Sequence, residues 1–267
     1  MQLSTFVTSV LAVTASAAPT YPTVTVTDAG SAIDALGSLS GYFNLVADKV
    51  KAVKSYGMAP VCDLSQAKMP LVISDGQLPP PAKGLKLAHV AIGRGTQNYT
   101  CDTSKPSSAP VATGAVATLF NGSCVAAMYP DLIERIPGMA VHFPLSDANK
   151  LGPASLAESG HHYFTADGVP FFDLRTPNQD IGEAPCAKNS SAPAPSLSAK
   201  GQLGENAVPW LRLTTIEGAT HKMKEVYRTT TAGGSAPATC QGMDAEFEVQ
   251  YATLYWFWAG DIEEDDA

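Results

Sequence analysis

Residues 246–258 alternate between two faces, which is the pattern of a β-strand that turns one side toward a core. One face carries Tyr251, Tyr255 and Phe257. The other begins with Glu246 and ends with Trp256 and Trp258, so we expect the strand to finish buried on both sides. An alternative is that Trp256 and Trp258, which share a side, form an aromatic platform for sugar rings. Core packing is the preferred interpretation of these tryptophans.

Further short apolar runs bounded by Gly, Pro, Ser and Asn read as strands joined by turns. The pattern predicts an all-β or β-rich fold, a single sandwich or barrel of about eight mainly antiparallel strands. Apolar spacing over residues 31–53 is near helical and predicts one or two short N-terminal helices. Low-complexity residues 184–207 are expected to form a surface excursion. The other candidate strands are residues 85–92, 96–101, 115–120, 161–166, 169–174, 208–214 and 223–230.

The first 17 residues read as a secretory signal peptide, because a short apolar run at 6–13 is followed by the A-x-A pattern Ala15-Ser16-Ala17. We expect residues 18–57 to form a segment with short helices and residues 58–260 to form one β-rich domain. Residues 261–267 form an acidic tail. The chain contains no apolar stretch long enough to be a transmembrane helix, so the sequence predicts no transmembrane segment.

The net charge of −8 argues against nucleic acid as a partner, because few cations would neutralise phosphates. Charged residues make up 16% of the 267-residue chain, below the roughly 25% usual in soluble domains. Glycans would supply the missing solubility in an exported protein. Three N-x-S/T acceptors are present, at Asn98, Asn121 and Asn189.

The five cysteines show neither a C-x-x-C motif nor a zinc-site spacing. In an oxidising compartment we expect two disulfides and one free thiol, and the sequence leaves all pairings open. The candidates are Cys62, Cys101, Cys124, Cys186 and Cys240.

Asp167-Gly168 lies between two apolar runs and predicts a two-residue β-hairpin turn. In that register Phe164 faces Phe171, and His162 faces Asp173 on the same side of the sheet. His161 points to the opposite side.

A histidine opposite an aspartate is a candidate general base with its orienting carboxylate, so His162 and Asp173 are the candidate catalytic pair. They are also weak candidates for a metal site completed by His89, His142 or His221. The preferred interpretation is a cross-strand polar pair that fixes the register. No nucleophile elbow, H-E-x-x-H motif or Walker loop is present.

Gly93-Arg94-Gly95 begins like a dinucleotide fingerprint, but the third glycine is missing and no helix is expected to follow. The sequence therefore predicts no NAD site and no other cofactor.

Five segments together resemble the family catalogued as domain of unknown function 3455. The resemblance covers the chain from about residue 58 onward and implies a secreted fungal protein with no settled activity. Members are often labelled malate dehydrogenase, a label that the missing fingerprint disfavours here. Shorter bacterial relatives imply a Cys101–Cys240 disulfide, followed by Cys62 with Cys124 or Cys186. The segments are LAHVAIGRGTQNYTC at 87–101, ATLF at 117–120, GHHYF at 160–164, VPWL at 208–211 and GGSAP at 233–237.

Two classes of function follow. The leading hypothesis is a non-enzymatic extracellular protein at a cell wall or host surface that binds glycan. The alternative is a secreted hydrolase-like or metal-assisted enzyme built on His162 and Asp173, and malate dehydrogenase ranks third.

Overall fold

The computed structural model describes residues 62–70, 78–146, 151 and 156–260. The predicted N-terminal signal, the helices over 31–53 and the acidic tail lie outside the described residues. No helix in the described part is long and apolar enough to cross a membrane.

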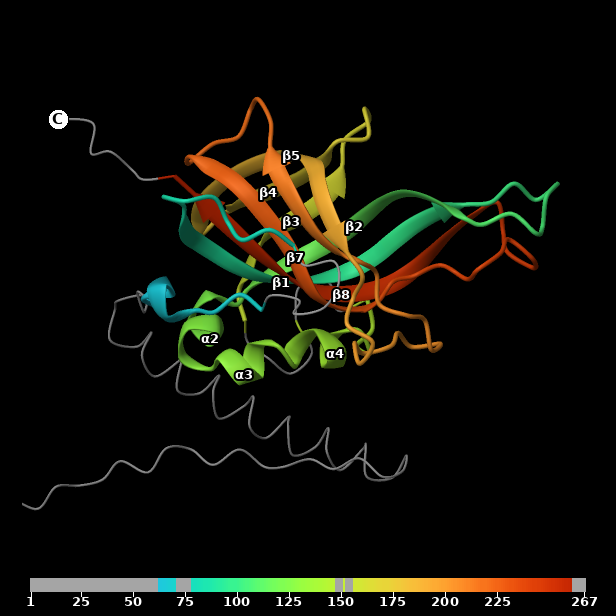
Figure 1. Ribbon diagram of the computed structural model, residues 1–267, viewed down its shortest axis with the longest axis horizontal. Helices are drawn as coiled ribbons and strands as arrows, with labels where there is room; N and C mark the ends of the chain where they lie inside the picture. Colours follow the sequence, from blue (N-terminus) through green and yellow to red (C-terminus); the bar gives the residue numbers. More distant parts are fainter. Residues whose placement is uncertain (1–61, 71–77, 147–150, 152–155, 261–267) are drawn as a thin grey trace, which may run out of the picture. The chain divides into compact units, whose positions relative to one another are not determined.

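Eight antiparallel strands follow one another around a closed barrel, and β1 pairs with β8 to close it (Figure 1). This confirms the predicted fold class and selects the barrel over the sandwich. The strands are β1 Lys86–Thr100, β2 Val111–Asn121, β3 Glu158–Phe164, β4 Pro170–Thr176, β5 Gln179–Ala192, β6 Trp210–Thr215, β7 Met223–Gly233 and β8 Glu246–Ala259.

In the described part of the chain, four short helical elements accompany the barrel. The helices α2 Ser123–Met128, α3 Pro130–Ile133 and α4 Ile136–Ala140 lie along one side of it, and η1 Leu64–Gln66 precedes β1 (Figure 1). The sequence patterns did not predict α2, α3 or α4. Their buried side chains, such as Ile133 and Ile136, pack on the outer wall of the barrel in one core.

The barrel has a second core inside its lumen. Phe172, Leu174, Val226, Tyr255 and Phe257 meet there. Because the lumen and the helices cover opposite faces of β8, that strand is buried on both sides in its second half, as its sequence predicted. Small residues on β1 leave room for the luminal rings: a Cβ added to Gly93 would lie 2.6 Å from Cε2 of Tyr255.

Two strand predictions need correction. The runs 85–92 and 96–101 belong to the single strand β1, so Gly93-Arg94-Gly95 lies inside a strand. The expected surface excursion over 184–207 instead begins with the second half of β5. The fully buried luminal residues of β5, Ala184 and Cys186, are small, and Ile181 is only partly buried against the same core. The sequence of β5 therefore lacks the regular alternation of large apolar and polar residues by which strands are predicted.

The predicted register of the β3–β4 hairpin is wrong by one residue. Phe164 pairs with Pro170, and Thr165 N donates to Val169 O over 2.9 Å, so Ala166, Asp167 and Gly168 form a three-residue loop. A two-residue type I′ turn needs positive φ at both Asp167 and Gly168, and only Gly168 has it, at +75°. The slip moves each residue of β4 to the opposite face from the one predicted relative to β3.

Gly160 in β3 makes this hairpin sensitive to substitution. Its φ is +144°, and an added Cβ would overlap the carbonyl oxygen of Asp173 in β4. We expect Gly160→Ala to lower the free energy of unfolding by about 3 kcal/mol, because backbone strain and a backbone clash add together. Urea denaturation measures the change.

Gly168→Ala is the matched control for this prediction. Gly168 also has positive φ, but nothing lies within 4 Å of the position of an added Cβ. We expect a loss of about 1 kcal/mol, from backbone conformation alone. Equal losses for the two variants would show that the close approach of β4 to Gly160 has no energetic weight.

Candidate functional site

The hairpin that carries the sequence-predicted candidates places them on opposite faces of the barrel wall. His162 pairs with Phe172 and points into the lumen, where it stacks on that ring with centroids 4.2 Å apart. Asp173 pairs with His161 on the outside. His162 and Asp173 therefore do not meet, and the geometry gives no support to an acid–base pair or a metal site built on them.

His162 is held as a neutral side chain. Its Nδ1 donates to the carbonyl oxygen of Phe171 over 2.9 Å, and the ring is buried. The pKa of His162 is lowered to about 4, mainly by burial and to a smaller extent by the nearby Arg228, while the hydrogen bond to Phe171 opposes the shift. At neutral pH the imidazole is a packed, uncharged luminal group.

The other histidines proposed as third ligands are scattered. His142 is exposed after α4, and His221 is exposed in the turn before β7. Among the residues that the structure describes, no three His, Cys, Asp or Glu side chains gather closely enough to hold a metal ion.

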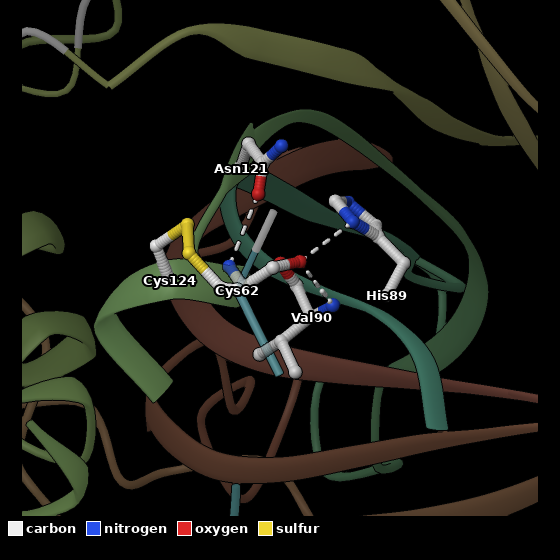
Figure 2. The surroundings of a disulfide bond; sticks show 6 residues. Cys62, His89, Val90, Asn121 and Cys124 are labelled. Carbon is white, nitrogen blue, oxygen red and sulfur yellow. Dashed lines mark hydrogen bonds between the residues drawn. A yellow bond between two sulfur atoms is a disulfide. The ribbon is translucent and has the colours of Figure 1, made fainter. Parts of the chain in front are cut away.

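His89 lies in a buried serine cluster beside the Cys62–Cys124 disulfide (Figure 2). Its Nδ1 is 2.9 Å from Ser123 Oγ and its Nε2 is 3.1 Å from Ser159 Oγ. Ser123 Oγ also accepts from Val90 N. Burial lowers the pKa of His89 to about 3. Both ring nitrogens are satisfied, so the cluster ties the start of α2 to β1 and β3.

An aromatic pair faces outward on the same hairpin. Tyr163 of β3 and Phe171 of β4 are register partners with ring centroids 5.3 Å apart and 30° between the planes. Tyr163 is 37% exposed, and the neighbouring Val116 of β2 is 53% exposed. We call Val116, Tyr163 and Phe171 the outer aromatic face. Exposed apolar side chains that gather in this way on an outer strand surface are typical of a binding surface.

A row of charged side chains borders the outer aromatic face. Arg175 Nε is 2.8 Å from Asp173 Oδ1, and its Nη2 is 2.6 Å from Glu183 Oε1. The hydrogen bond from Arg175 lowers the pKa of Asp173, so the carboxylate stays ionised. On β3, His161 Nε2 is 3.1 Å from Glu158 Oε1. Hydrogen-bonding groups of both kinds thus lie beside the exposed rings.

The tryptophan platform considered from the sequence does not exist. Trp256 is fully buried in the core beneath the helices, where its Nε1 donates to Thr229 Oγ1 over 2.9 Å. Trp258 is partly buried and packs against the same core. On the outer surface the exposed ring is Tyr163 of β3, beside the half-buried Phe171 of β4.

Four of the five cysteines form two disulfides. Disulfides join Cys62 to Cys124 and Cys101 to Cys240. Cys186 is a buried free thiol, and burial raises its pKa to about 12.

The three acceptor asparagines differ in exposure. Asn189 is exposed on β5 and Asn98 is half-buried on β1. Asn121, also half-buried, accepts from Ser123 N through its Oδ1.

The sequence did not indicate Tyr163 or Arg175 as site residues. The predicted hairpin register placed Phe171 on the same face as His162, whereas in the structure it lies on the face of Tyr163. The information needed was the length of the loop: with three residues in place of two, the same alternation puts Tyr163, Phe171, Asp173 and Arg175 outside together. Glu183 could not have been found, because β5 itself was not predicted.

The comparisons with known proteins place the chain by family alone. A family model described as "Protein of unknown function (DUF3455)" matches residues 81–259, a range that contains all eight strands. No curated protein and no solved structure matches the chain.

Proposed function

Because this chain belongs to the DUF3455 family, which is described only as a protein of unknown function, we propose its function from its surface. We propose an exported, non-enzymatic protein that binds a cell-wall or host glycan on the outer aromatic face. The observation that carries the proposal is the outward Tyr163–Phe171 pair, of which Tyr163 is exposed and Phe171 half-buried, beside the Asp173–Arg175–Glu183 cluster.

The chemistry of a pyranose ring fits this surface. One side of such a sugar presents C–H groups that pack on aromatic rings, and its rim presents hydroxyls that both donate and accept. The Asp173 and Glu183 carboxylates accept hydrogen bonds, and the Arg175 guanidinium donates them. Arg175 bonds to both carboxylates, which holds the three groups in place before a ligand arrives.

Export is the second part of the proposal. It is supported by the signal-peptide pattern at residues 1–17, by two disulfides, which persist in oxidising compartments, and by the acceptor sequences at Asn98, Asn121 and Asn189. Asn189 is the acceptor that the structure leaves most exposed, since Asn98 and Asn121 are both half-buried. Attached glycans would offset the low fraction of charged residues.

The test is binding to insoluble cellulose, chitin and β-1,3-glucan, followed by calorimetry with soluble oligosaccharides of whichever polymer retains the protein. We expect Tyr163→Ala and Phe171→Ala each to weaken binding about tenfold, since each removes one stacked ring worth about 1.4 kcal/mol. Circular dichroism checks that the barrel stays folded.

Leu197→Ala is the matched control, because Leu197 is 97% exposed in the loop after β5, outside the outer aromatic face. It should bind like the unmodified protein. If no polysaccharide retains the protein, or if Tyr163→Ala and Phe171→Ala bind unchanged, glycan binding at this face is excluded.

A further inference from the structure

The lumen of the barrel contains a buried arginine that has no carboxylate partner among the described residues. Arg228 of β7 is 8% exposed, and its register partner Tyr255 belongs to the luminal core. Its Nη1 donates to Gln97 Oε1 over 3.3 Å, and its Nη2 donates to the carbonyl oxygen of Pro209 over 2.9 Å. Both acceptors are neutral, and no carboxylate in the described part of the chain forms an ion pair with Arg228.

Other arginines of the barrel do have carboxylate partners. Arg212 of β6 lies on the outside of the barrel and has a carboxylate partner, Glu225 of β7, which its Nε and Nη2 both contact. Arg175 likewise contacts two carboxylates. The luminal Arg228 is more buried than either of them and lacks such a partner. Burying a cation without an anion is costly, so its retention calls for an explanation.

Two buried donors at this point have no well-aligned acceptor among the described residues, although the Tyr251 and Tyr255 hydroxyls interact with the same two side chains. The two donors are Nε of Arg228 and Nε2 of Gln97 on β1, which is also 8% exposed. Because Oε1 of the same Gln97 amide accepts from Arg228, the unused amide donor lies next to the guanidinium. Unsatisfied buried donors are uncommon in folded proteins and mark places where another acceptor belongs. A positive charge with adjacent N–H donors is suited to an anionic oxygen ligand.

Aromatic groups surround these donors. The hydroxyls of Tyr251 and Tyr255 lie 2.9 Å apart, and both side chains are fully buried in the lumen. Burial raises the pKa of both tyrosines, which keeps them protonated and able to donate. The His162 ring lies edge-on to Tyr255, with ring centroids 5.6 Å apart. The His162 ring also contacts the ring of Phe164. The site therefore combines a cationic end with a set of aromatic rings.

We propose that this end of the lumen, formed by Gln97, Arg228, Tyr251 and Tyr255, binds a small organic carboxylate. Its two oxygens accept from Arg228 Nε and Gln97 Nε2, and its apolar body packs on the tyrosine rings. The proposal is independent of glycan binding, because Arg228 faces the lumen whereas Tyr163 and Phe171 face outward.

Benzoate and hexanoate are the probes, with inorganic phosphate as a third arm, titrated into the full chain by calorimetry and by thermal denaturation. We expect one benzoate or hexanoate per chain and a melting temperature that rises with its concentration. Arg228→Met should weaken this binding at least tenfold. Arg135→Gln, which removes an exposed arginine between α3 and α4, should leave it unchanged.

Several results would overturn the proposal. They are the absence of carboxylate binding by the unmodified protein up to about 10 mM, binding of phosphate alone, and equal affinity of Arg228→Met and the unmodified protein. If Arg228→Met does not fold, Gln97→Met keeps the Arg228 charge but removes both the unused amide donor and the acceptor of Arg228 Nη1, and it must weaken benzoate or hexanoate binding about fivefold. Unchanged affinity of Gln97→Met would then exclude the site.

Discussion

Lowering the pH from 7 to 5 should reduce the free energy of unfolding by about 4 kcal/mol, through His89 and His162. In the folded barrel burial lowers the pKa of these side chains to about 3 and about 4, whereas histidine in an unfolded chain titrates near 6.5. Below pH 6.5 the unfolded chain therefore binds protons that the folded chain does not. Each histidine contributes about 2 kcal/mol at pH 5, and stability continues to fall until the folded pKa is reached.

Urea denaturation at pH 7 and pH 5 measures this effect. In His162→Phe the loss of unfolding free energy between pH 7 and pH 5 should shrink to about 2 kcal/mol, because of the two buried histidines only His89 then remains. His161→Phe is the control, since His161 occupies the next position of β3 but is exposed. If His162→Phe keeps the full pH dependence, burial of the neutral His162 ring is not its cause.

Removing the Cys101–Cys240 disulfide should lower the free energy of unfolding by about 5 kcal/mol. The two cysteines are 139 residues apart in the sequence. A crosslink across so long a loop removes much conformational entropy from the unfolded chain, which is the main source of its effect in the chain-entropy model. The double variant Cys101→Ala/Cys240→Ala, compared with the unmodified protein in guanidinium, gives the value.

Cys186→Ala controls for the loss of buried cysteine side chains, because Cys186 is buried but not crosslinked. It should cost about 1 kcal/mol, the transfer energy of a small apolar group. A loss of stability in the double variant no larger than that in Cys186→Ala would mean that the unfolded chain gains no freedom when the crosslink is removed.

The barrel could be predicted from the sequence where both faces of a strand carry large apolar residues. β8 is the best example, because its alternation identified the luminal rings Tyr255 and Phe257 and the outward Trp256 together. β5 could not be found in this way. Its inward Ala184 and Cys186 are small, and it is a strand because β4 and β6 pair with it.

The candidate site was less predictable than the fold, since it depends on the register between strands. The choice between a two-residue and a three-residue loop at Asp167-Gly168 is a small difference in backbone energy, decided by the conformation of Asp167. That choice alone separates His162 from Asp173 and brings Tyr163 beside Phe171. Contacts across the barrel, such as Arg228 with Gln97, join residues 131 positions apart and leave no local pattern.

Local spacing along the chain therefore identified the strand segments other than β5 and the residues of one strand that share a face, because side-chain direction in a strand has a period of two. It also indicated the family, through segments that recur in order. Only the tertiary structure decided that the eight strands close into a barrel, that Tyr163 and Phe171 lie outside, and that Arg228 is enclosed in the lumen with no carboxylate partner among the described residues. Those features depend on register and closure, which arise from contacts between strands distant in sequence.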